Sequence, residues 1–390
     1  MAIQSFMPCK GMDNVSEDAA LVQGGKEPYV FVRDAVNVNV TPAGKIEMVA
    51  SGGKVTDSPY KGMWQSPLHK DVFAVFDGHW VKVSVRDWSH EQLAAIGHGD
   101  VSHAVLNNLV VVAGKHGLYT YDGRIAQPLT IQTPPSPIPD SAIADHTKTR
   151  SVAISWLRGS MESSLSDYVV MGVSATMALP MVFDPTVTGV NIYSTSVGGT
   201  DMQLVGTVSR GTTSFLIESN HKLGMAAQFA HLSPMPTGKY LCYWRGRLIT
   251  ATANVIRFSE PLAYHLHDER HGFIQTSQRI TFIQPVDNGL WVGQVDHVIF
   301  IQGTQPDDME VSIKSAQAPI PDSAIQIASN DVGDVSEGGN LVTVWLASNG
   351  YVAGNSAGQI VEYQARRISN ISAQTSTTVR LGRRLLTAVN

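Results

Sequence analysis

The sequence has few charges, and this scarcity excludes some classes of partner. Only 16% of its 390 residues are Asp, Glu, Lys or Arg, and the formal net charge is −5. A typical soluble domain has about 25% charged residues, so much of the surface must consist of neutral polar side chains. Without a general positive charge, the chain does not read as a dedicated nucleic-acid-binding protein. Passing contact with DNA stays open.

Cysteines and long apolar runs are also scarce. Cys9 and Cys242 are the only two cysteines. A disulfide between them is one alternative, and two reduced thiols are the favoured one. No run approaches 18 apolar residues, and the first six residues lack the charged and apolar regions of a signal peptide. We therefore expect assembly in a cytoplasm and no membrane insertion.

The familiar catalytic motifs are missing as well. The sequence contains no Gly-x-x-x-x-Gly-Lys-Ser/Thr loop, no Gly-x-Ser-x-Gly elbow and no His-Glu-x-x-His helix. The Asp-box repeats of sialidase-like proteins are absent too. These absences argue against nucleotide hydrolysis and against serine or zinc hydrolysis of the usual kinds. We expect no cofactor, and we assign no catalytic, cofactor-binding or metal-binding residue.

One dense polar cluster invites a metal-site interpretation. His265, His267 and His271 lie close together with Asp268, Glu269 and Arg270 between them. His-x-His on a strand places both imidazoles on one face, where they could bind a transition metal. A solvated loop between sheets accounts for the same residues, because Asp, Glu and Arg can pair with one another. We favour the loop and leave metal binding open.

Two further groups of charged residues have a functional and a plain interpretation. Carboxylate pairs spaced across a sugar site would suit glycoside hydrolysis, but solvated turn residues are the favoured interpretation of Asp307, Asp308, Asp331, Asp334 and Glu337. The C-terminal segment has no acidic residue after Glu362. It favours docking to a neighbouring subunit, or a final strand, over a DNA contact, and its basic residues are Arg366, Arg367, Arg380, Arg383 and Arg384.

What the sequence does contain is an internal repeat. The heptapeptide Pro-Ile-Pro-Asp-Ser-Ala-Ile occurs at 137–143 and again at 319–325. Upstream of it, segment 109–123 parallels segment 290–303, each with an apolar strand, a short turn and a second strand. The two halves of the chain therefore share one hairpin pattern and one heptapeptide that follows it.

The same hairpin pattern recurs elsewhere, with Gly or Asn in its turns. It is seen at 72–85, 248–258 and 351–363, and Asp-Gly or Asn-Gly turns between strand patterns are strong hairpin signals. Only 89–96 looks helical. Repeated hairpins predict an all-β fold, a β-propeller of about six four-stranded blades. Its packing residues would include Trp64, Trp80, Trp244, Trp291 and Trp345.

A stretch of different character interrupts the repeats. It begins with 151–157 and continues with expected strands near 167–174, 178–183, 189–195, 202–208 and 213–217. Six short strands in about 75 residues are typical of a small β-sandwich, and the prolines of 134–137 form a stiff linker into it. The expected organisation is propeller at 1–143, inserted sandwich at 144–219, and propeller at 220–390.

Several segments resemble tail proteins of tailed bacteriophages. The first is Phe31 to Val40, with the Arg33-Asp34-Ala35 sequence that in this family belongs to the opening strand. The others are 190–195, 240–248, Phe258-Ser259-Glu260-Pro261 and 283–293. These matches cover about half of the chain. In this family a propeller carries a fibronectin-type-III-like sandwich.

The resemblance implies a virion structural protein of the tail rather than an enzyme, in a nozzle, hub or tip ring. It would form a homo-oligomeric ring, contact adaptor, hub or fibre proteins, and allow DNA to pass during ejection without specific binding. The low charge fits this role, because copies packed side by side need little mutual repulsion. The alternative is a propeller that binds or degrades host surface polysaccharide.

Overall fold

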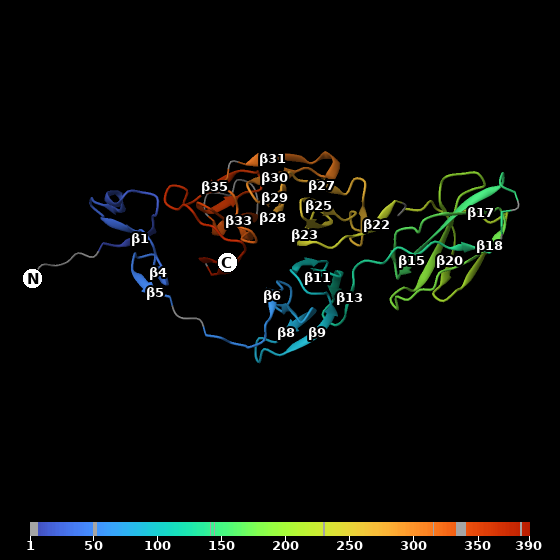
Figure 1. Cartoon of the computed structure of the whole chain (residues 1–390), viewed down its shortest axis with the longest axis horizontal. Helices are drawn as coiled ribbons and strands as arrows, with labels where there is room; N and C mark the ends of the chain where they lie inside the picture. The colour runs from blue at the N-terminus through green and yellow to red at the C-terminus, as the bar shows by residue number, and fades with distance from the viewer. Residues whose placement is uncertain are drawn as a thin grey trace, which may run out of the picture. The chain divides into compact units, whose positions relative to one another are not determined.

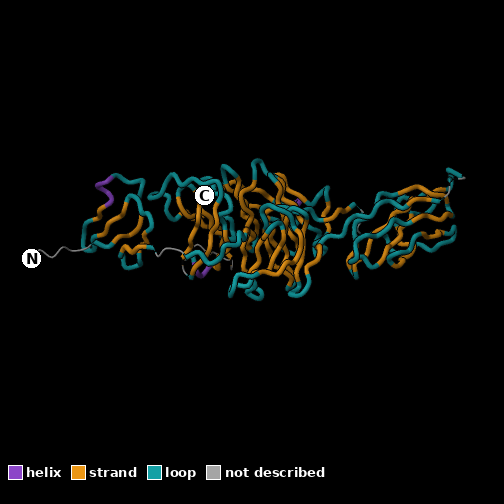
Figure 2. Tube along the Cα trace, turned by 60° about the horizontal axis from the view of Figure 1, so that its bottom comes forward, coloured by secondary structure: helices purple, strands orange, loops and turns teal. Residues whose placement is uncertain are grey.

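A computed structural model describes residues 7–49, 53–140, 142–143, 145–228, 231–314, 316–332, 341–382 and 384–390. Regular structure in these ranges is almost entirely strand, with no α-helix and three short 3-10 helices, at Asp18–Leu21, Pro306–Asp308 and Ser329–Asp331 (Figure 2). No helix in these ranges is long and apolar enough to cross a membrane. The all-β prediction is confirmed. The chain divides into two compact units, Tyr60–Gln275 and Met1–Pro59 with Thr276–Asn390.

Three four-stranded antiparallel sheets form the larger part of the unit Tyr60–Gln275 (Figure 1). The first holds β6 (Lys61–Gln65), β7 (Val72–Phe76), β8 (His79–Val83) and β9 (His90–Ala95). The second holds β10 (Ser102–Leu106), β11 (Leu109–Gly114), β12 (Gly117–Tyr121) and β13 (Ala126–Pro128). The third holds β23 (Lys239–Trp244), β24 (Arg247–Thr252), β25 (Val255–Phe258) and β27 (Phe273–Gln275).

These sheets pack face to face, and β11 shows why its sequence is continuously apolar. Val110 and Val112 on one face of β11 join the core that contains Phe73 and Trp80 of the first sheet. Val111 on the other face joins the core that contains Leu248 of the third sheet. A strand buried on both faces has no exposed position for a polar residue.

The unit Met1–Pro59 with Thr276–Asn390 contains two further four-stranded sheets. One holds β28 (Ile280–Val286), β29 (Gly289–Gln294), β30 (Val298–Gln302) and β31 (Glu310–Lys314); the other holds β32 (Ile325–Ala328), β33 (Leu341–Ala347), β34 (Gly350–Gly354) and β35 (Ile360–Glu362). Trp291 and Trp345 pack between them with ring centroids 5.4 Å apart. A Cβ on Gly354 would lie 2.4 Å from the Trp291 ring, so only glycine fits there.

Smaller sheets come from the two ends of the chain. β1 (Cys9–Met12), β2 (Val22–Gln23) and β3 (Tyr29–Val32) form one sheet, and β4 (Val38–Val40) pairs with β5 (Ile46–Met48). β36 (Ser376–Leu381) pairs with β37 (Arg384–Val389). The two ends meet where the Asn14 side-chain amide donates to the Ser369 carbonyl over 3.0 Å and accepts from the Ser369 amide over 2.9 Å.

Two sheets between β13 and β22 (Leu232–Pro234) enclose a core of their own, and we call them the two-sheet module. One sheet consists of β14 (Ile138–Pro139), β18 (Ala175–Ala178) and β21 (Ser214–Ile217). The other consists of β15 (Thr149–Arg158), β16 (Met161–Glu162), β17 (Val169–Gly172), β19 (Gly189–Ser194) and β20 (Gln203–Ser209). Ile154 and Ile192 of the second sheet pack against Met177 of the first. β14 joins the module from before residue 144, the expected first residue of the insert.

The predicted hairpins are present, and their turns explain their sequences. β7 and β8 pair so that Phe76 faces His79, which leaves Asp77 and Gly78 as a two-residue turn. Both have left-handed φ angles, +46° and +73°, which Asp and Gly adopt with little strain. The repeated segments 109–123 and 290–303 form equivalent hairpins, β11 with β12 and β29 with β30.

The described residues contain five four-stranded sheets, one fewer than the six blades we expected. The helix expected at 89–96 is wrong, because these residues form β9, which pairs with β8. The helix-forming residues of this segment are outweighed by ladder bonds to the preceding strand. The strand expected at 178–183 is also wrong, because β18 ends at Ala178 before Pro180, which has no N–H for the ladder.

Residues 33–37 differ from the strand that the phage-tail resemblance implied. They connect β3 to β4, and Asn37 has a left-handed φ of +55°. The Asp34 carboxylate accepts the amide of Ala35 over 2.7 Å. These two local features bend the chain, so Arg33-Asp34-Ala35 lies in a connection rather than in a strand.

Cysteine and tryptophan behave as the sequence predicted. Cys9 and Cys242 are buried free thiols, and burial raises the pKa of Cys242 to about 12. Trp80, Trp291 and Trp345 are fully buried and Trp244 is nearly so. Trp64 stacks on His103 with centroids 5.0 Å apart. These five tryptophans therefore pack sheets, as expected.

Candidate functional site

The histidine cluster does not form a metal site among the described residues. His265 and His267 are buried, and each ring is hydrogen-bonded to a backbone carbonyl. His265 Nε2 lies 2.8 Å from the Glu162 oxygen, and His267 Nδ1 lies 2.9 Å from the Phe258 oxygen. Burial lowers the pKa of both imidazoles. The described part of the chain has no group of three or more His, Cys, Asp or Glu placed to hold a metal ion.

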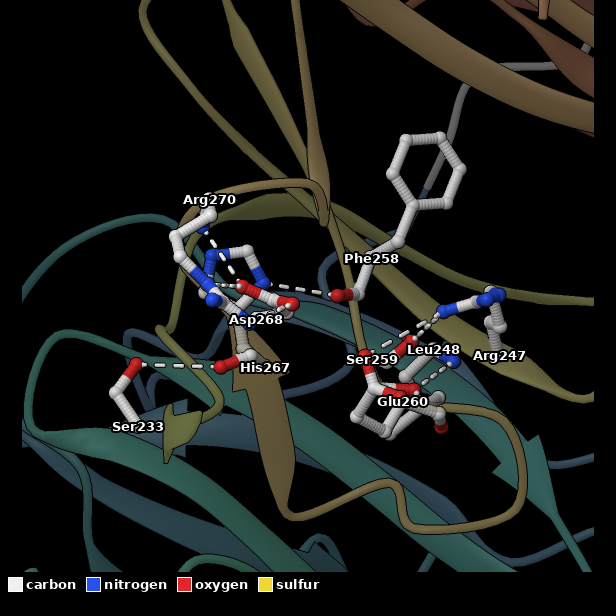
Figure 3. Close-up of polar contacts among 9 residues, drawn as sticks. All are labelled: Ser233, Arg247, Leu248, Phe258, Ser259, Glu260, His267, Asp268 and Arg270. Atoms are coloured by element: carbon white, nitrogen blue, oxygen red, sulfur yellow. Dashed lines mark hydrogen bonds and ion pairs between the residues drawn. The ribbon is translucent and has the colours of Figure 1, made fainter. Parts of the chain in front are cut away.

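The solvated-loop interpretation of this cluster is also wrong for these two histidines. β26 (Leu266–Asp268) pairs with β22, and this pairing takes His265 and His267 into the interior. Only the end of the cluster is exposed, where Arg270 pairs with Asp268 over 3.3 Å (Figure 3). Sequence reasoning missed the burial because it depends on β22, a strand of three residues with no strong pattern.

A buried arginine organises the neighbouring turn (Figure 3). Arg247 donates to the Ser259 carbonyl over 2.7 Å and lies 4.0 Å from the Glu260 carboxylate. The Ser259 hydroxyl accepts the amide of Leu248 over 2.9 Å. Burial lowers the pKa of Arg247, and the charge of Glu260 opposes this effect. The Phe258-Ser259-Glu260 segment of the resemblance thus has a structural role in holding β24 and β25 together.

The outer face of the two-sheet module carries a polar cluster centred on Glu162. Its Oε1 accepts from Asn191 over 2.9 Å, from the Tyr193 hydroxyl over 2.6 Å, and from Ser155. Burial, with the hydrogen bond to Glu162, raises the pKa of Tyr193. Because His265 binds the Glu162 carbonyl, this cluster lies where the module meets β26. We call this region the junction.

Further bonds connect the junction to the chain segment that leads into the module. Arg158 donates to the carbonyls of Pro128 and Thr130 over 2.6 and 3.3 Å and pairs with Asp184 over 3.1 Å. Burial opposes ionisation of Asp184, but bonds from Thr186 and the Arg158 guanidinium outweigh it and lower its pKa. Thr133 and Ser164 share a hydroxyl bond of 2.5 Å. The chain that leads into the proline-rich linker is therefore tied to the module, and within the linker the Ser136 hydroxyl donates to the Asp167 carbonyl over 3.0 Å.

A cavity of about 640 Å³ opens beside the junction. It is lined by the start of β20, the loop before β17 and the chain before β22. Its charged or titratable side chains are Asp167, Tyr168, Asp201, His231 and Glu269. No sequence signal pointed to it, since these residues come from four separate segments.

The three described carboxylates, Asp307, Asp308 and Asp331, lie in two separate 3-10 helices. Asp308 accepts the amide of Gln305 over 2.7 Å at the start of a 3-10 helix, and Asp331 pairs with Arg380 over 2.9 Å. Asp308 therefore bonds within its own turn, and Asp331 pairs with a residue of β36. Asp307 belongs to the same 3-10 helix as Asp308. Asp334 and Glu337 lie outside the described residues.

The C-terminal arginines are dispersed. Arg367 lies over the Phe31 ring at 4.2 Å, and Arg380 pairs with Asp331. Arg384 borders an open groove of about 650 Å³ together with Arg367 and Lys10. Arg366 is exposed, and Arg383 lies outside the described residues. The choice between docking and DNA contact stays a prediction.

Comparison with known proteins adds little to these observations. No family model and no curated protein matches the chain. Among solved structures it is similar to a chain of a mitotic checkpoint complex, with 9% identity, 80% of each chain covered and a TM-score of 0.30. It is similar to Saccharomyces cerevisiae Sqt1, with 8% identity, 79% of this chain and 74% of the other covered, and a TM-score of 0.31.

A third similar structure is the WD40 domain of SCAP from fission yeast. The identity is 10%, 86% of this chain and 72% of the other are covered, and the TM-score is 0.28. Likenesses at this level carry no argument about what the chain does. Its all-β architecture rests on its own sheets and their registers.

Proposed function

We propose that this chain is a structural component of a bacteriophage tail, a subunit of a nozzle, hub or tip ring. In this proposal the four-stranded sheets are blades of a β-propeller, and the two-sheet module is a fibronectin-type-III-like insert. The protein has no catalytic activity and no cofactor. It resides in the virion and contacts adaptor, hub or fibre proteins while DNA passes without specific binding.

The observation that carries this proposal is the rigid attachment of the two-sheet module. Arg158 and His265 bind backbone carbonyls on the two sides of the junction, at 2.6 Å and 2.8 Å. Each of these bonds links the module to a segment outside it, and hydrogen bonds in such a buried polar region rigidify it. A module that presents a surface to a neighbouring tail protein needs such a fixed orientation.

Two further observations support the proposal. The residues at 190–195 and 258–261 that resemble the phage-tail family lie in β19 and beside the junction. Exposed apolar side chains occur on strands at both ends of the chain, among them Met48 and Leu381. Surfaces of this kind suit contacts between protein subunits.

Locating the protein in the particle tests the proposal. We expect antibodies against the chain, carrying gold, to label the tail of intact phage particles in electron micrographs, and we expect the chain among the proteins of purified virions. Label confined to the capsid, or a chain absent from purified virions, would refute a tail role. Cleavage of host polysaccharide by the purified protein would instead support the carbohydrate-active alternative.

A further inference from the structure

A groove of about 650 Å³ opens where the two ends of the sequence meet, and we call it the basic groove. Its charged side chains are Lys10 of β1, Arg367 of the segment after β35, and Arg384 of β37. The rest of its described lining is uncharged and consists of Pro8, Cys9, Gly11 and residues 40–44. Three cations from three segments therefore share one groove, and its described lining includes no carboxylate.

Backbone contacts fix the part of the basic groove that comes from the N-terminal segment. The Cys9 amide donates to the Gly44 carbonyl over 2.8 Å, and the Gly44 amide donates to the Thr41 carbonyl over 2.8 Å. Gly44 has a left-handed φ of +80°, and a Cβ there would lie 2.3 Å from the Cβ of Pro8. The turn 41–44 therefore packs directly against the start of β1, as only glycine permits.

Aromatic rings hold two of the three cations at the basic groove. The Arg367 guanidinium lies over the Phe31 ring at 4.2 Å, and Lys10 Nζ lies over the Tyr29 ring at 4.1 Å. The Asn14 amide also donates to the Arg367 carbonyl over 2.8 Å. Because the face of an aromatic ring attracts a cation, both charges are positioned before any ligand arrives.

The third cation, Arg384, belongs to the hairpin of β36 with β37, which is anchored to the same unit. The hydroxyls of Ser376 and Thr378 donate to the carbonyls of Pro321 and Ser323, each over 2.7 Å. These bonds fix the position of the hairpin and therefore that of Arg384 at the basic groove.

The three cations are exposed, and none of them belongs to an ion pair within the described part of the chain. By contrast, Arg33 and Lys45 of the N-terminal segment each pair with a carboxylate. The pKa of Asp13 is lowered chiefly by the backbone bond from Ser16, and the charge of Arg367 contributes less. The positive charge of the basic groove is therefore available to an anion from outside the chain.

Charge around the basic groove favours a short anion over a long one. Residues 7–49 contain six acidic and four basic residues, and five of the six acidic side chains are exposed. Duplex DNA carries one charge about every 1.7 Å along its axis, so a duplex that crossed the groove would also meet these carboxylates. The volume of the groove is within the range of clefts that hold small ligands, about 300–1,000 Å³. A short acidic segment meets the three cations and avoids the surrounding acidic side chains.

We propose that the basic groove binds a short acidic peptide segment of a neighbouring tail protein through its Asp or Glu side chains. Arg367 and Arg384 each present a planar guanidinium that matches the geometry of a carboxylate, and Lys10 adds a compact charge. This inference rests on the proposed function, since the tail supplies the neighbour, and it names the site at which the chain holds that neighbour. No covalent step is involved.

The first test measures binding of a fluorescein-labelled peptide, in which glutamate alternates with serine, to the full-length chain by fluorescence anisotropy. The ionic strength is about 0.15 M, where exposed charges further apart than about 8 Å are largely screened. We expect this peptide to bind, and we expect the same peptide with glutamine in place of glutamate not to bind. A wild-type chain that does not bind the glutamate peptide, or that binds both peptides equally, would overturn the inference.

Variants test whether the peptide occupies the basic groove. Arg367→Gln and Arg384→Gln should each raise the dissociation constant by about threefold, and the double variant by about tenfold, as expected for loss of exposed ion pairs. Arg366→Gln is the matched control, because Arg366 is exposed and adjacent in sequence but does not line the groove. It should change the constant less than about 1.5-fold. An equal effect of Arg366→Gln would show that the peptide responds only to total charge and would refute the site.

A second variant separates loss of binding from loss of structure. Arg384 has no side-chain hydrogen bond within the described chain and is exposed, so Arg384→Gln leaves the fold intact. Arg367→Gln removes the contact with Phe31, whereas Arg367→Lys keeps a cation over that ring. We expect Arg367→Lys to bind the peptide within about twofold of wild type, and circular dichroism shows that each variant folds. Loss of binding in Arg367→Lys equal to that in Arg367→Gln would argue against a charge contact.

The second test offers the groove other occupants. Single-stranded and double-stranded DNA oligonucleotides with the same number of charges as the peptide should bind more weakly than the peptide. Inorganic phosphate should displace the peptide no better than chloride does at equal ionic strength. Tighter binding of DNA that Arg384→Gln weakens would assign the groove to nucleic acid, and displacement by phosphate would assign it to a small anion. Self-association that Arg384→Gln abolishes would make a second copy the occupant, and each of these three results would overturn the inference.

These outcomes separate the two proposals. If the protein is found in the tail but the glutamate peptide does not bind, the acidic-segment site is refuted and the tail role stands. If the peptide binds in the groove but particles carry no label on the tail, the tail role is refuted and the groove remains a site for acidic segments of another protein.

Discussion

The heptapeptide Pro-Ile-Pro-Asp-Ser-Ala-Ile has two different environments in this molecule. In the first copy Ile138 belongs to β14, at the edge of the two-sheet module, and is 68% exposed. In the second copy Ile320 is 5% exposed, and its amide donates to the Leu346 carbonyl over 2.8 Å. The isoleucine of the repeated sequence therefore lies exposed in a two-residue strand of one unit and buried in the interior of the other.

The backbone differs between the two copies as well. Asp322 has a left-handed φ of +61°, a conformation that Asp140 does not share. The Asp140 amide donates to Thr176, and the Asp322 amide to Thr281. Local sequence cannot account for this difference, so the neighbouring strands must select the conformation. The following experiments test that contrast, beginning with the largest expected effect.

Replacing the isoleucines compares the two environments directly. Ile320→Ala should lower the free energy of unfolding by about 2–5 kcal/mol, since it removes buried methyl groups. Ile138→Ala should change it by less than about 0.5 kcal/mol. Urea unfolding followed by tryptophan fluorescence measures both values, because each unit has buried tryptophans: Trp80 and Trp244 in that of the first copy, Trp291 and Trp345 in that of the second. Equal losses for the two variants would contradict the difference in burial.

Acid should destabilise the unit of the first copy selectively. The residue His103 is half-buried, but its Nε2 is shielded from solvent, and burial lowers its pKa from 6.5 to about 3. At pH values between these two pKa values the unfolded chain binds the proton and the folded chain does not, so the free energy of unfolding falls as the pH falls. The loss from this residue is about 1.4 kcal/mol for each pH unit below 6.5.

Burial also lowers the pKa of His265 and His267, which lie in the same unit. Hydrogen exchange measured from pH 7 down to 4 should therefore show protection lost earlier in 60–275 than in 276–390. A His103→Gln chain should lose less stability over this range. An unchanged pH dependence in that variant would argue against a neutral, buried imidazole.

The serine of the second copy provides a smaller test. The Ser323 hydroxyl donates to the Ile320 carbonyl over 2.7 Å and accepts the Leu346 amide over 3.1 Å, with no solvent exposure. Ser323→Ala should lower the unfolding free energy by about 1–3 kcal/mol, because a buried N–H loses its partner. Ser136→Ala, beside the first copy and half-buried, is the control and should have an effect below about 0.5 kcal/mol, because water can replace the bond of its hydroxyl to the Asp167 carbonyl.

The smallest expected effect concerns the aspartates. Asp140→Gly should lower stability by about 0.5–1 kcal/mol, because glycine gains entropy in the unfolded chain. Asp322→Gly should have a smaller effect, since glycine relieves the left-handed φ while the Thr375 bond of 3.1 Å is lost. Thermal unfolding of both variants measures the difference. A larger loss for Asp322→Gly would show that the hydrogen bond outweighs the strain.

Prediction succeeded where local chemistry determines structure. The Asp77-Gly78 turn and the continuous apolar run of β11 follow from φ preferences and from burial on both faces. It failed where pairing between strands overrides helix propensity: residues 89–96 form helices readily by propensity, yet pairing of 90–95 with the preceding strand β8 makes them β9. It also failed where segments distant in the chain meet. The candidate site was missed for this second reason, since Glu162, Asn191 and His265 meet only through tertiary contacts.

The sequence by itself determined that the chain is built from strands, where its hairpins turn, and which tryptophans pack between sheets. These properties depend on residues within a few positions of one another. Tertiary structure alone decided that one heptapeptide is exposed and its copy buried, and that His265 and His267 bind carbonyls in the interior. Burial and hydrogen-bond partners are supplied by segments distant in the chain, and a short sequence carries no information about which segment will cover it.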